Sequence, residues 1–337
     1  MFKNLLYIGN KLSAHGMNQT SIETLGVLLQ KEGYRIHFSS SKKNQYFRLF
    51  DMCWAVVFQS KKTECVLIDT YSTSSFWYAF STSQLCRIFS VPYIPILRGG
   101  NLLNRIKKNP RLSKMIFDNS FKNVAPSNFL YDGFKEFGFQ NLVFIPNTIE
   151  INNYQFKKRE IFQPKLLWVR AFASIYNPKM AIDVLCLLKK KYPEATLCMV
   201  GPDKDGSLSE VKEYAQKRNV TVSFPGKMSK TEWTSLSEEY DVFINTTHFD
   251  NTPISVIEAM GLGLAVVSTN VGGIPYLLEE NHDAILVNDN DVNAMTEGIE
   301  KIINNQKFAK IITSNARNKA ASFDWEMVKG KWFETLQ

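Results

Sequence analysis

The sequence lacks the features that define several large protein classes. It has only five cysteines in 337 residues, and no two of them form a Cys-x-x-Cys pair. This count argues against a disulfide framework and favours a reducing compartment. No stretch approaches the ~18–20 consecutive apolar residues that cross a bilayer. The short apolar run after Met1 is typical of a first strand rather than of a signal peptide. We therefore expect a cytoplasmic protein.

Motifs for bound metals and redox cofactors are also missing. No group of His, Cys and Asp residues has the spacing of metal ligands. The chain contains no Gly-x-Gly-x-x-Gly for a dinucleotide, no Gly-x-Ser-x-Gly for a hydrolase and no kinase lysine motif. His15 follows the first predicted strand, but a lone histidine in a loop is more often structural or exposed than catalytic. We expect neither a metal ion nor a cofactor.

Positive charge is concentrated in the first half of the chain. Residues 1–160 contain 21 Lys and Arg against 10 Asp and Glu, a net charge of +11, whereas residues 161–337 contain 19 against 22. This asymmetry suggests that the first half meets an anionic partner, either nucleic acid or a membrane surface. Basic residues that are merely solvated are the alternative. No nucleic-acid-binding module is recognisable, so we expect no nucleic acid.

Short apolar runs alternate with helical stretches in two successive series. This alternation predicts two α/β domains with parallel sheets. We expect an N-terminal domain at 1–150, a linker at 151–164, a second domain at 165–320 and a C-terminal helix at 321–337 that packs back toward the first domain. The predicted strands are 5–8, 35–38, 65–68, 93–97, 123–125, 142–145, 165–169, 195–200, 221–224, 242–245, 264–267 and 284–287. The predicted helices are 18–32, 44–59, 75–89, 127–137, 178–191, 207–218, 229–239, 253–262, 291–304 and most of 306–337.

The most informative stretch is 248–273, where a polar loop leads into a helix. Thr252 is a good N-cap residue, and Pro253 suits the first helical position. The next backbone N–H groups would then be unpaired, and with the helix dipole they form a site suited to phosphate. These N–H groups belong to Ile254, Ser255 and Val256.

Two carboxylates flank this helix start. Asp250 lies in the loop and Glu258 lies one to two turns inside the helix. Carboxylates repel phosphate, so they would instead accept hydrogen bonds from hydroxyls, and a ligand with phosphates and many hydroxyls is a nucleotide sugar. The alternative is a surface helix whose carboxylate compensates the dipole. The buried strand that follows and Gly272-Gly273, where only glycine allows a backbone to approach a ligand closely, favour the ligand site.

The stretch from Asp250 to Pro275 resembles the Glu-x7-Glu motif of glycosyltransferase family 4, the group 1 enzymes of bacterial surface-polysaccharide type. The first position is Asp here, where the family more often has Glu. The resemblance implies the GT-B fold, with two facing Rossmann-like domains built on parallel sheets. It also implies that the second domain binds a nucleotide-sugar donor without a metal.

The resemblance further implies roles for individual residues. Asp250, Glu258 and Arg170 would be catalytic, and Arg170 and Lys179 would hold the diphosphate. The turns at Gly201 and at Lys227-Met228 look like the nucleotide-base pocket. The complete predicted donor site is Gly16, Arg170, Lys179, Gly201, Lys227, Met228, Asp250, Asn251, Thr252, Pro253, Ile254, Ser255 and Glu258. The predicted acceptor side is Arg98, Gly99, Gly100 and Asn101.

A basic stretch at 105–117 offers a second candidate surface. Its basic residues alternate with apolar ones, which predicts either a helix that lies on an anionic membrane or a core-facing helix with a solvated side. The charge of the first half favours the membrane, at the inner face of the cytoplasmic membrane. The basic residues are Arg105, Lys107, Lys108, Arg111 and Lys114.

These features lead to one functional hypothesis and two alternatives. The hypothesis is a retaining glycosyltransferase that moves a sugar from a nucleotide-diphosphate sugar to a saccharide or lipid-linked saccharide acceptor. Its expected role is in capsule, lipopolysaccharide or exopolysaccharide assembly. One alternative is a nucleotide-sugar 2-epimerase of the same fold, and the other is a non-catalytic GT-B-like subunit that serves a partner enzyme.

Overall fold

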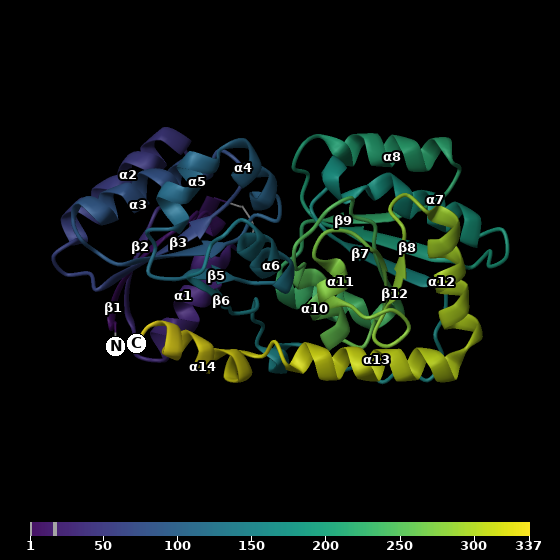
Figure 1. The fold of residues 1–337 in the computed structure, drawn as a ribbon. Helices are drawn as coiled ribbons and strands as arrows, with labels where there is room; N and C mark the ends of the chain where they lie inside the picture. The colour runs from purple at the N-terminus through teal and green to yellow at the C-terminus, as the bar shows by residue number, and fades with distance from the viewer. Residues whose placement is uncertain (1, 16–18) are drawn as a thin grey trace. The chain divides into compact units, whose positions relative to one another are not determined.

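The computed structural model describes residues 2–15 and 19–337, which form two compact α/β units (Figure 1). Unit 1 comprises residues 1–148 together with 328–337, and unit 2 comprises residues 149–327. Across the described residues, no helix has the length and apolar character needed to span a bilayer.

Unit 1 is built on a six-stranded parallel sheet. The strand order is β2-β1-β3-β4-β5-β6, so the direction of winding reverses between β1 and β3. The central strands consist almost entirely of buried residues, as expected when helices cover both faces of a sheet. The strands are β1 (Asn4–Ile8), β2 (Arg35–Ser39), β3 (Cys65–Thr70), β4 (Tyr93–Leu97), β5 (Asn123–Ala125) and β6 (Leu142–Phe144).

The helices of unit 1 include a break within the basic stretch. Asn109 separates α4 from α5, because Pro110 cannot donate the backbone hydrogen bond that a continuous helix needs. The apolar residues Ile106, Ile116 and Phe117 are buried in the core of the unit. Most apolar residues of the stretch therefore face the core, while Met115 is 39% exposed. The helices are α1 (Ser21–Lys31), α2 (Gln45–Gln59), α3 (Phe76–Ile88), α4 (Leu102–Lys108), α5 (Pro110–Phe117) and α6 (Asn128–Glu136).

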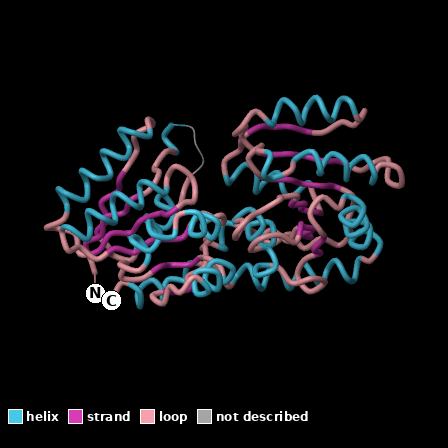
Figure 2. Tube along the Cα trace, turned by 45° about the horizontal axis from the view of Figure 1, so that its top comes forward, coloured by secondary structure: helices cyan, strands magenta, loops and turns pink. Residues whose placement is uncertain are grey.

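Unit 2 has a second six-stranded parallel sheet, drawn with its covering helices in Figure 2. The order β12-β11-β10-β7-β8-β9 places the reversal of winding between β7 and β10. The strands are β7 (Lys165–Val169), β8 (Thr196–Val200), β9 (Ser223–Gly226), β10 (Val242–Asn245), β11 (Ala265–Thr269) and β12 (Ile285–Val287). The helices are α7 (Pro178–Leu188), α8 (Ser207–Lys217), α9 (Lys230–Leu236), α10 (Ile254–Gly261), α11 (Ile274–Leu277), α12 (Val292–Asn304) and α13 (Gln306–Ala321). The predicted pair of α/β sheets is confirmed.

The core of unit 2 has one apolar layer on each face of this sheet. Successive residues of a strand point to opposite faces. Accordingly, Leu166 and Trp168 join one buried cluster and Leu167 joins the other. The indole N–H of Trp168 donates to the Thr246 hydroxyl at 3.1 Å, which links β7 to the loop that follows β10. The two layers thus fix the neighbouring carboxyl ends of β7 and β10.

The segment 151–164, which was predicted to be a linker, packs onto unit 2. Tyr154, Arg159 and Phe162 are buried there. The Arg159 guanidinium bonds the Asp241 carboxylate at 3.1 Å and the backbone carbonyls of residues 237, 240 and 262 at 2.9–3.0 Å. The Arg159 side chain thus ties this segment to buried acceptors of unit 2.

The C-terminal helix α14 (Trp325–Thr335) runs from one unit into the other along the chain. The backbone N–H of Trp325 bonds Ile149 in unit 2. From Val328 onward the chain belongs to unit 1, where the Phe2 N–H donates to the Leu336 carbonyl and the rings of Tyr34 and Phe333 stack at 6.2 Å.

The buried Arg159 gives a test of this packing. Arg159→Met leaves the Asp241 carboxylate without its cation, and breaking a buried pair in this way typically costs about 3–5 kcal/mol. We expect a clearly lower urea-unfolding midpoint for this variant. Lys158→Met is the matched control because the Lys158 side chain is 79% exposed, and it should change stability by no more than about 0.5 kcal/mol. Equal midpoints for the two variants would refute the structural role of Arg159.

Candidate functional site

The candidate site lies at the carboxyl ends of β7 and β10, where ligands bind in doubly wound sheets. Arg170 follows β7 directly, and Asp250 lies in the loop after β10. The Arg170 guanidinium forms an ion pair with the Asp250 carboxylate, and both side chains are largely buried. The guanidinium also lies 4.4 Å from the centre of the Tyr176 ring. Burial lowers the pKa of Arg170, but an arginine stays charged in proteins.

Three glycines allow neighbouring backbone segments to approach the loops that carry Arg170 and Asp250. A Cβ on Gly201 would lie 1.7 Å from the Arg170 carbonyl oxygen. A Cβ on Gly272 would lie 2.3 Å from the Asp250 carbonyl, and one on Gly273 would lie 2.0 Å from the Asn251 carbonyl. The glycine pair was expected to approach a ligand. In the structure it approaches the 250–251 loop instead, and the Gly273 N–H donates to the Asp250 carbonyl at 2.9 Å.

Helix α10 begins one residue later than predicted. Pro253 has ψ of 116°, an extended conformation, so Pro253 rather than Thr252 is the residue that precedes the helix. The Val256 N–H donates to the Pro253 carbonyl at 3.1 Å and is therefore not available to a ligand. Among the described residues, none accepts from the amides of Ile254 and Ser255. The predicted anion site thus has two free backbone donors instead of three.

Two buried side-chain groups near this helix start also lack partners. The Ser255 hydroxyl and the Arg170 Nε are inaccessible to solvent, and no group in the described part of the chain bonds them. Leaving a buried donor unpaired costs about 1–3 kcal/mol, more for a charged group. Unsatisfied donors beside a helix N-terminus are what a phosphate group would satisfy.

Glu258 lies one turn into α10 and is buried. The Tyr154 hydroxyl and the Lys230 ammonium both donate to its Oε1, each at 2.6 Å. No described residue bonds Oε2. Burial, and then the charge of Glu258, raise the pKa of Tyr154, so its phenol keeps its proton. Neither Tyr154 nor Lys230 was predicted as a site residue, because each is distant in sequence and no local motif links either to Glu258.

The remaining predicted donor residues occupy less central positions. The ammonium of Lys179 bonds Glu210 of α8 at 2.8 Å, and that bond raises the pKa of Lys179. A diphosphate would have to displace Glu210 to bind it. Met228 packs against the core layer that contains Val256, and Lys227 is exposed beside it. Asn251 and Thr252 are buried next to Asp250, whereas Gly16 lies outside the described residues.

The predicted acceptor-side residues lie in unit 1, and Arg98 is engaged within it. Its Nε bonds the buried carboxylate of Asp69 at 3.0 Å, and its Nη1 bonds Asn147 at 2.7 Å. The Tyr7 hydroxyl donates to the same carboxylate at 3.1 Å. Burial raises the pKa of Asp69, against the opposing effect of Arg98. Arg98 therefore binds the neighbouring strand β3 through its guanidinium.

The other three acceptor-side residues differ in exposure. Gly99 packs against β3's following loop, since a Cβ there would lie 2.6 Å from the Ser72 nitrogen. Gly100 is half-buried, and Asn101 is exposed just before α4. These two remain open at the carboxyl edge of the unit 1 sheet.

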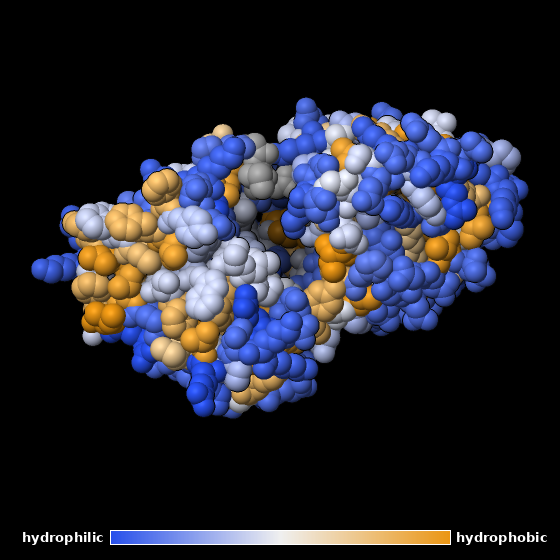
Figure 3. Space-filling model, turned by 90° about the horizontal axis from the view of Figure 1, so that it is seen from above, coloured by the Kyte–Doolittle hydropathy of each residue, from blue (hydrophilic) through white to orange (hydrophobic). Residues whose placement is uncertain are grey.

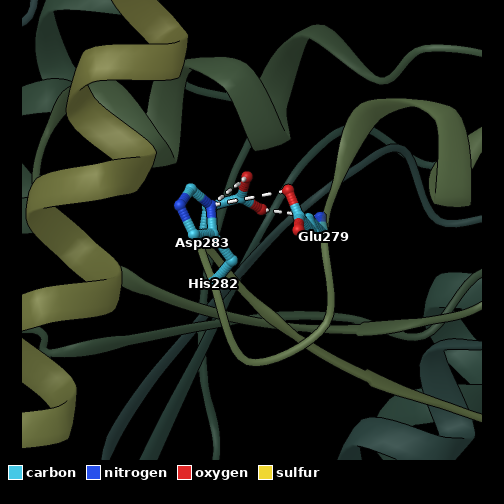
Figure 4. A group of neighbouring side chains, drawn as sticks. All are labelled: Glu279, His282 and Asp283. Carbon is cyan, nitrogen blue, oxygen red and sulfur yellow. Dashed lines mark hydrogen bonds and ion pairs between the residues drawn. The ribbon is translucent and has the colours of Figure 1, made fainter.

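A cluster of possible metal ligands, absent from the sequence analysis, lies in the loop before β12. Figure 4 shows Glu279, His282 and Asp283 with their polar atoms turned toward one another. Both Asp283 oxygens are already bonded, one to the Lys319 ammonium and the other to the Glu279 N–H at 2.8 Å. Because Lys319 supplies the positive charge there, we interpret the group as an ion-paired cluster.

The chain matches known glycosyltransferases in sequence. Residues 152–319 match the family model of the glycosyl transferases group 1. The GalNAc-alpha-(1->4)-GalNAc-alpha-(1->3)-diNAcBac-PP-undecaprenol alpha-1,4-N-acetyl-D-galactosaminyltransferase of Campylobacter jejuni is 25% identical over 48% of this chain and 44% of its own length. A glycosyltransferase of Methanocaldococcus jannaschii is 24% identical over 70% of this chain and 66% of its own. The chain thus covers less than two thirds of these curated relatives.

Solved structures match over nearly the whole chain. Anabaena HepE in complex with UDP-glucose aligns with a TM-score of 0.81 at 16% identity, over 100% of this chain and 99% of that one. Sucrose-phosphate synthase of Thermosynechococcus elongatus aligns with a TM-score of 0.83 at 15% identity, over 99% of both chains. At such identities the likeness concerns the fold, which is the expected GT-B fold. Residues 152–319 are thus similar to the group 1 glycosyl transferases.

Proposed function

We propose that this protein is a glycosyltransferase that moves a sugar from a nucleotide-diphosphate sugar to a saccharide or lipid-linked saccharide acceptor. One observation carries the proposal. The buried Arg170–Asp250 pair lies at the switch point of the unit 2 sheet. Asp250 is in the loop just before α10, and the Ser255 hydroxyl at the start of that helix is unpaired among the described residues. A cation, free amides and a carboxylate together fit a ligand with both phosphates and hydroxyls.

The diphosphate of the donor would bind at the start of α10. The amides of Ile254 and Ser255, the Ser255 hydroxyl and the helix dipole favour an anion there. The planar guanidinium of Arg170 can bond two phosphate oxygens at once. Negative charge on the diphosphate grows as the bond between sugar and oxygen breaks, so these groups would stabilise the leaving group. They supply the positive charge that a metal ion would otherwise provide, and we propose no metal.

The two carboxylates would bind hydroxyls of the donor. Tyr154 and Lys230 fix the Glu258 carboxylate through Oε1, which leaves Oε2 to accept from the ribose. Asp250 is paired with Arg170. When a diphosphate draws Arg170 toward itself, the Asp250 carboxylate becomes available to a sugar hydroxyl. Arg170 then exchanges its bond to Asp250 for one to phosphate, and Asp250 exchanges its bond to Arg170 for one to a sugar hydroxyl.

We further propose that transfer retains the anomeric configuration. No protein nucleophile is implied, and the donor phosphate would take the acceptor proton on the same face of the sugar. The Campylobacter jejuni relative is named for an undecaprenol-linked substrate, which supports a lipid-linked acceptor and a role in surface-polysaccharide assembly. Such an acceptor would place a cytoplasmic enzyme at the inner face of the membrane.

A thermal-shift screen with UDP-, GDP- and ADP-sugars tests the donor. A ligand that binds only the folded protein at 100 times its Kd adds about 2.7 kcal/mol of stability. We expect one nucleotide class to raise the melting temperature, and no shift with any of them would contradict the proposal. Conversion of the nucleotide sugar without an acceptor would favour the 2-epimerase. Donor binding without any turnover would favour the non-catalytic subunit.

Glu258→Gln should weaken donor binding while leaving the fold intact. A hydrogen bond to a charged acceptor is worth about 1.5–3 kcal/mol, so we expect the donor Kd, measured by calorimetry, to rise about 10- to 100-fold. Glu300→Gln is the control, because Glu300 is also a partly buried partner of a lysine in unit 2. An unchanged Kd for Glu258→Gln would rule out ribose recognition by this residue.

Arg170→Gln should lower kcat more than it raises the donor KM. The guanidinium acts most strongly on charge that develops in the transition state, and loss of one such donor typically costs about 100-fold or more in kcat. Arg218→Gln removes an exposed arginine from an ion pair with Asp183 and should leave both constants unchanged. If Arg170→Gln affects KM alone, the residue contributes only to ground-state binding.

A further inference from the structure

Helix α2 of unit 1 exposes a row of aromatic rings. Phe47, Phe50, Trp54 and Phe58 are 69%, 65%, 53% and 59% exposed. Their spacing of three and four residues places them on one side of the helix. The rings of Phe50, Trp54 and Phe58 lie in a row, with centroids 5.7 Å apart for Phe50 and Trp54 and 4.1 Å apart for Trp54 and Phe58. Together with Phe47 on the same side of the helix, they form the surface that we call the aromatic face.

The other side of the same helix is mostly apolar. Met52 and Val56 are buried in the core of unit 1, and the buried guanidinium of Arg48 lies over the Tyr78 ring. A helix with apolar residues on most of its surface is normally buried on most sides, but the aromatic side of α2 is exposed within the described chain. At about 200 Å² per aromatic side chain, the four rings alone leave about 500 Å² exposed, comparable to the largest apolar patch of a typical monomer.

Further apolar residues extend the aromatic face onto neighbouring parts of unit 1. Trp77 on α3 and the pair Ile88-Phe89 at its end are exposed, and α3 packs beside α2. Figure 3 shows hydrophobic residues gathered on one face of unit 1, seen from above. The surface is therefore broader than one helix.

Lysines stand at both ends of the aromatic face. Lys42 and Lys43 precede α2, and Lys61 and Lys62 follow it. All four are exposed, and in the described part of the chain no carboxylate pairs with them. The one acidic residue of the helix, Asp51, bonds the Ser39 hydroxyl at 3.3 Å on its inner side. The rim of the surface is thus positively charged.

We propose that the aromatic face docks unit 1 on an anionic lipid surface. Aromatic rings favour the interface between lipid and water, and lysines beside them attract acidic headgroups. A second copy of the chain is a poorer occupant, because pairing two aromatic faces in either direction would bring lysines against lysines. The proposal places the docking surface on α2 rather than on the stretch 105–117, where Ile106, Ile116 and Phe117 are buried and only Met115 is an exposed large apolar residue. It does not depend on the proposed transferase activity.

Vesicle co-sedimentation of the whole chain tests the proposal. We expect the protein to bind vesicles that contain phosphatidylglycerol, to bind pure phosphatidylcholine much less, and to detach as salt rises. The ring variant Phe50→Ser/Trp54→Ser/Phe58→Ser should lose at least about a hundredfold in partitioning, because each ring removes a large buried area. The lysine variant Lys42→Gln/Lys43→Gln/Lys61→Gln/Lys62→Gln should lose about a hundredfold at low salt only.

Two control variants locate the surface. Tyr276→Ser removes an exposed ring from unit 2, where Tyr276 is 50% exposed, and should bind like the wild type. Lys107→Gln/Lys108→Gln/Arg111→Gln/Lys114→Gln neutralises the basic stretch and should retain most of the binding. Circular dichroism and melting temperature report whether each variant is folded. Trp54→Ser alone serves if the triple variant fails to fold, with an expected loss of at least about tenfold.

Three results would overturn the proposal. The first is a wild type that ignores anionic vesicles at low salt. The second is a folded ring variant that binds them as well as the wild type does. The third is a dimer in sedimentation velocity that the ring variant abolishes, which would assign the aromatic face to a second copy of the chain.

Discussion

The ion pair between Arg170 and Asp250 is the interaction on which the candidate site depends. Removing two charges from water costs several kcal/mol for each ion, and only close, well-placed partners repay that cost. Here the closeness comes from the backbone. Gly201 allows the Arg170 carbonyl to approach β8, and Gly272 and Gly273 allow the 250–251 loop to approach the end of β11. Any side chain at these positions would push the two loops apart.

The pair also explains how one site could recognise two kinds of group. A phosphate would offer Arg170 the negative charge that Asp250 supplies, and a sugar hydroxyl would offer Asp250 a donor in place of the guanidinium. A ligand with only one of these groups would leave one buried charge uncompensated, which is strongly unfavourable. A nucleotide sugar carries both. Its recognition would therefore be cooperative within the site, because each new bond makes the other possible.

Much of the fold could be predicted because the strands are short apolar runs buried on both faces. β4, β5, β7 and β10 have the predicted bounds. β9 is observed two residues later than predicted, at Ser223–Gly226, and its pairing with β8 shifts register near Cys198. The apolar pattern of one strand cannot predict such a register shift, because the shift depends on how that strand pairs with its neighbour. The division of 105–117 into two helices follows from Pro110. The alternation of basic and apolar residues runs through this proline and so does not indicate the break.

The site was less predictable because its partners are distant in the sequence. Arg170 and Asp250 were both singled out, but their mutual ion pair required the order of the sheet. Tyr154 and Lys230, which fix Glu258, carry no local signal at all. The Gly272-Gly273 pair was predicted to let the backbone approach a ligand, and in the structure its close neighbours are the backbone atoms of residues 250 and 251. That contact joins segments more than 20 residues apart, so the local sequence does not reveal it.

In two places, unit 1 departs from the usual rule that charged residues are exposed and apolar residues are buried. Arg98 and Asp69, which composition would place at the surface, pair inside the unit, whereas four aromatic rings of α2 face outward. The first arrangement satisfies itself, because each charge has its partner. Among the described residues, the exposed rings of α2 have no such partner. Burial against another apolar surface would be more favourable for them than contact with water. Within the described chain, only one side of α2 is buried. The exposed side of α2, with lysines at both ends, fits a partner that has an apolar interior and an anionic surface. A bilayer with acidic headgroups has both.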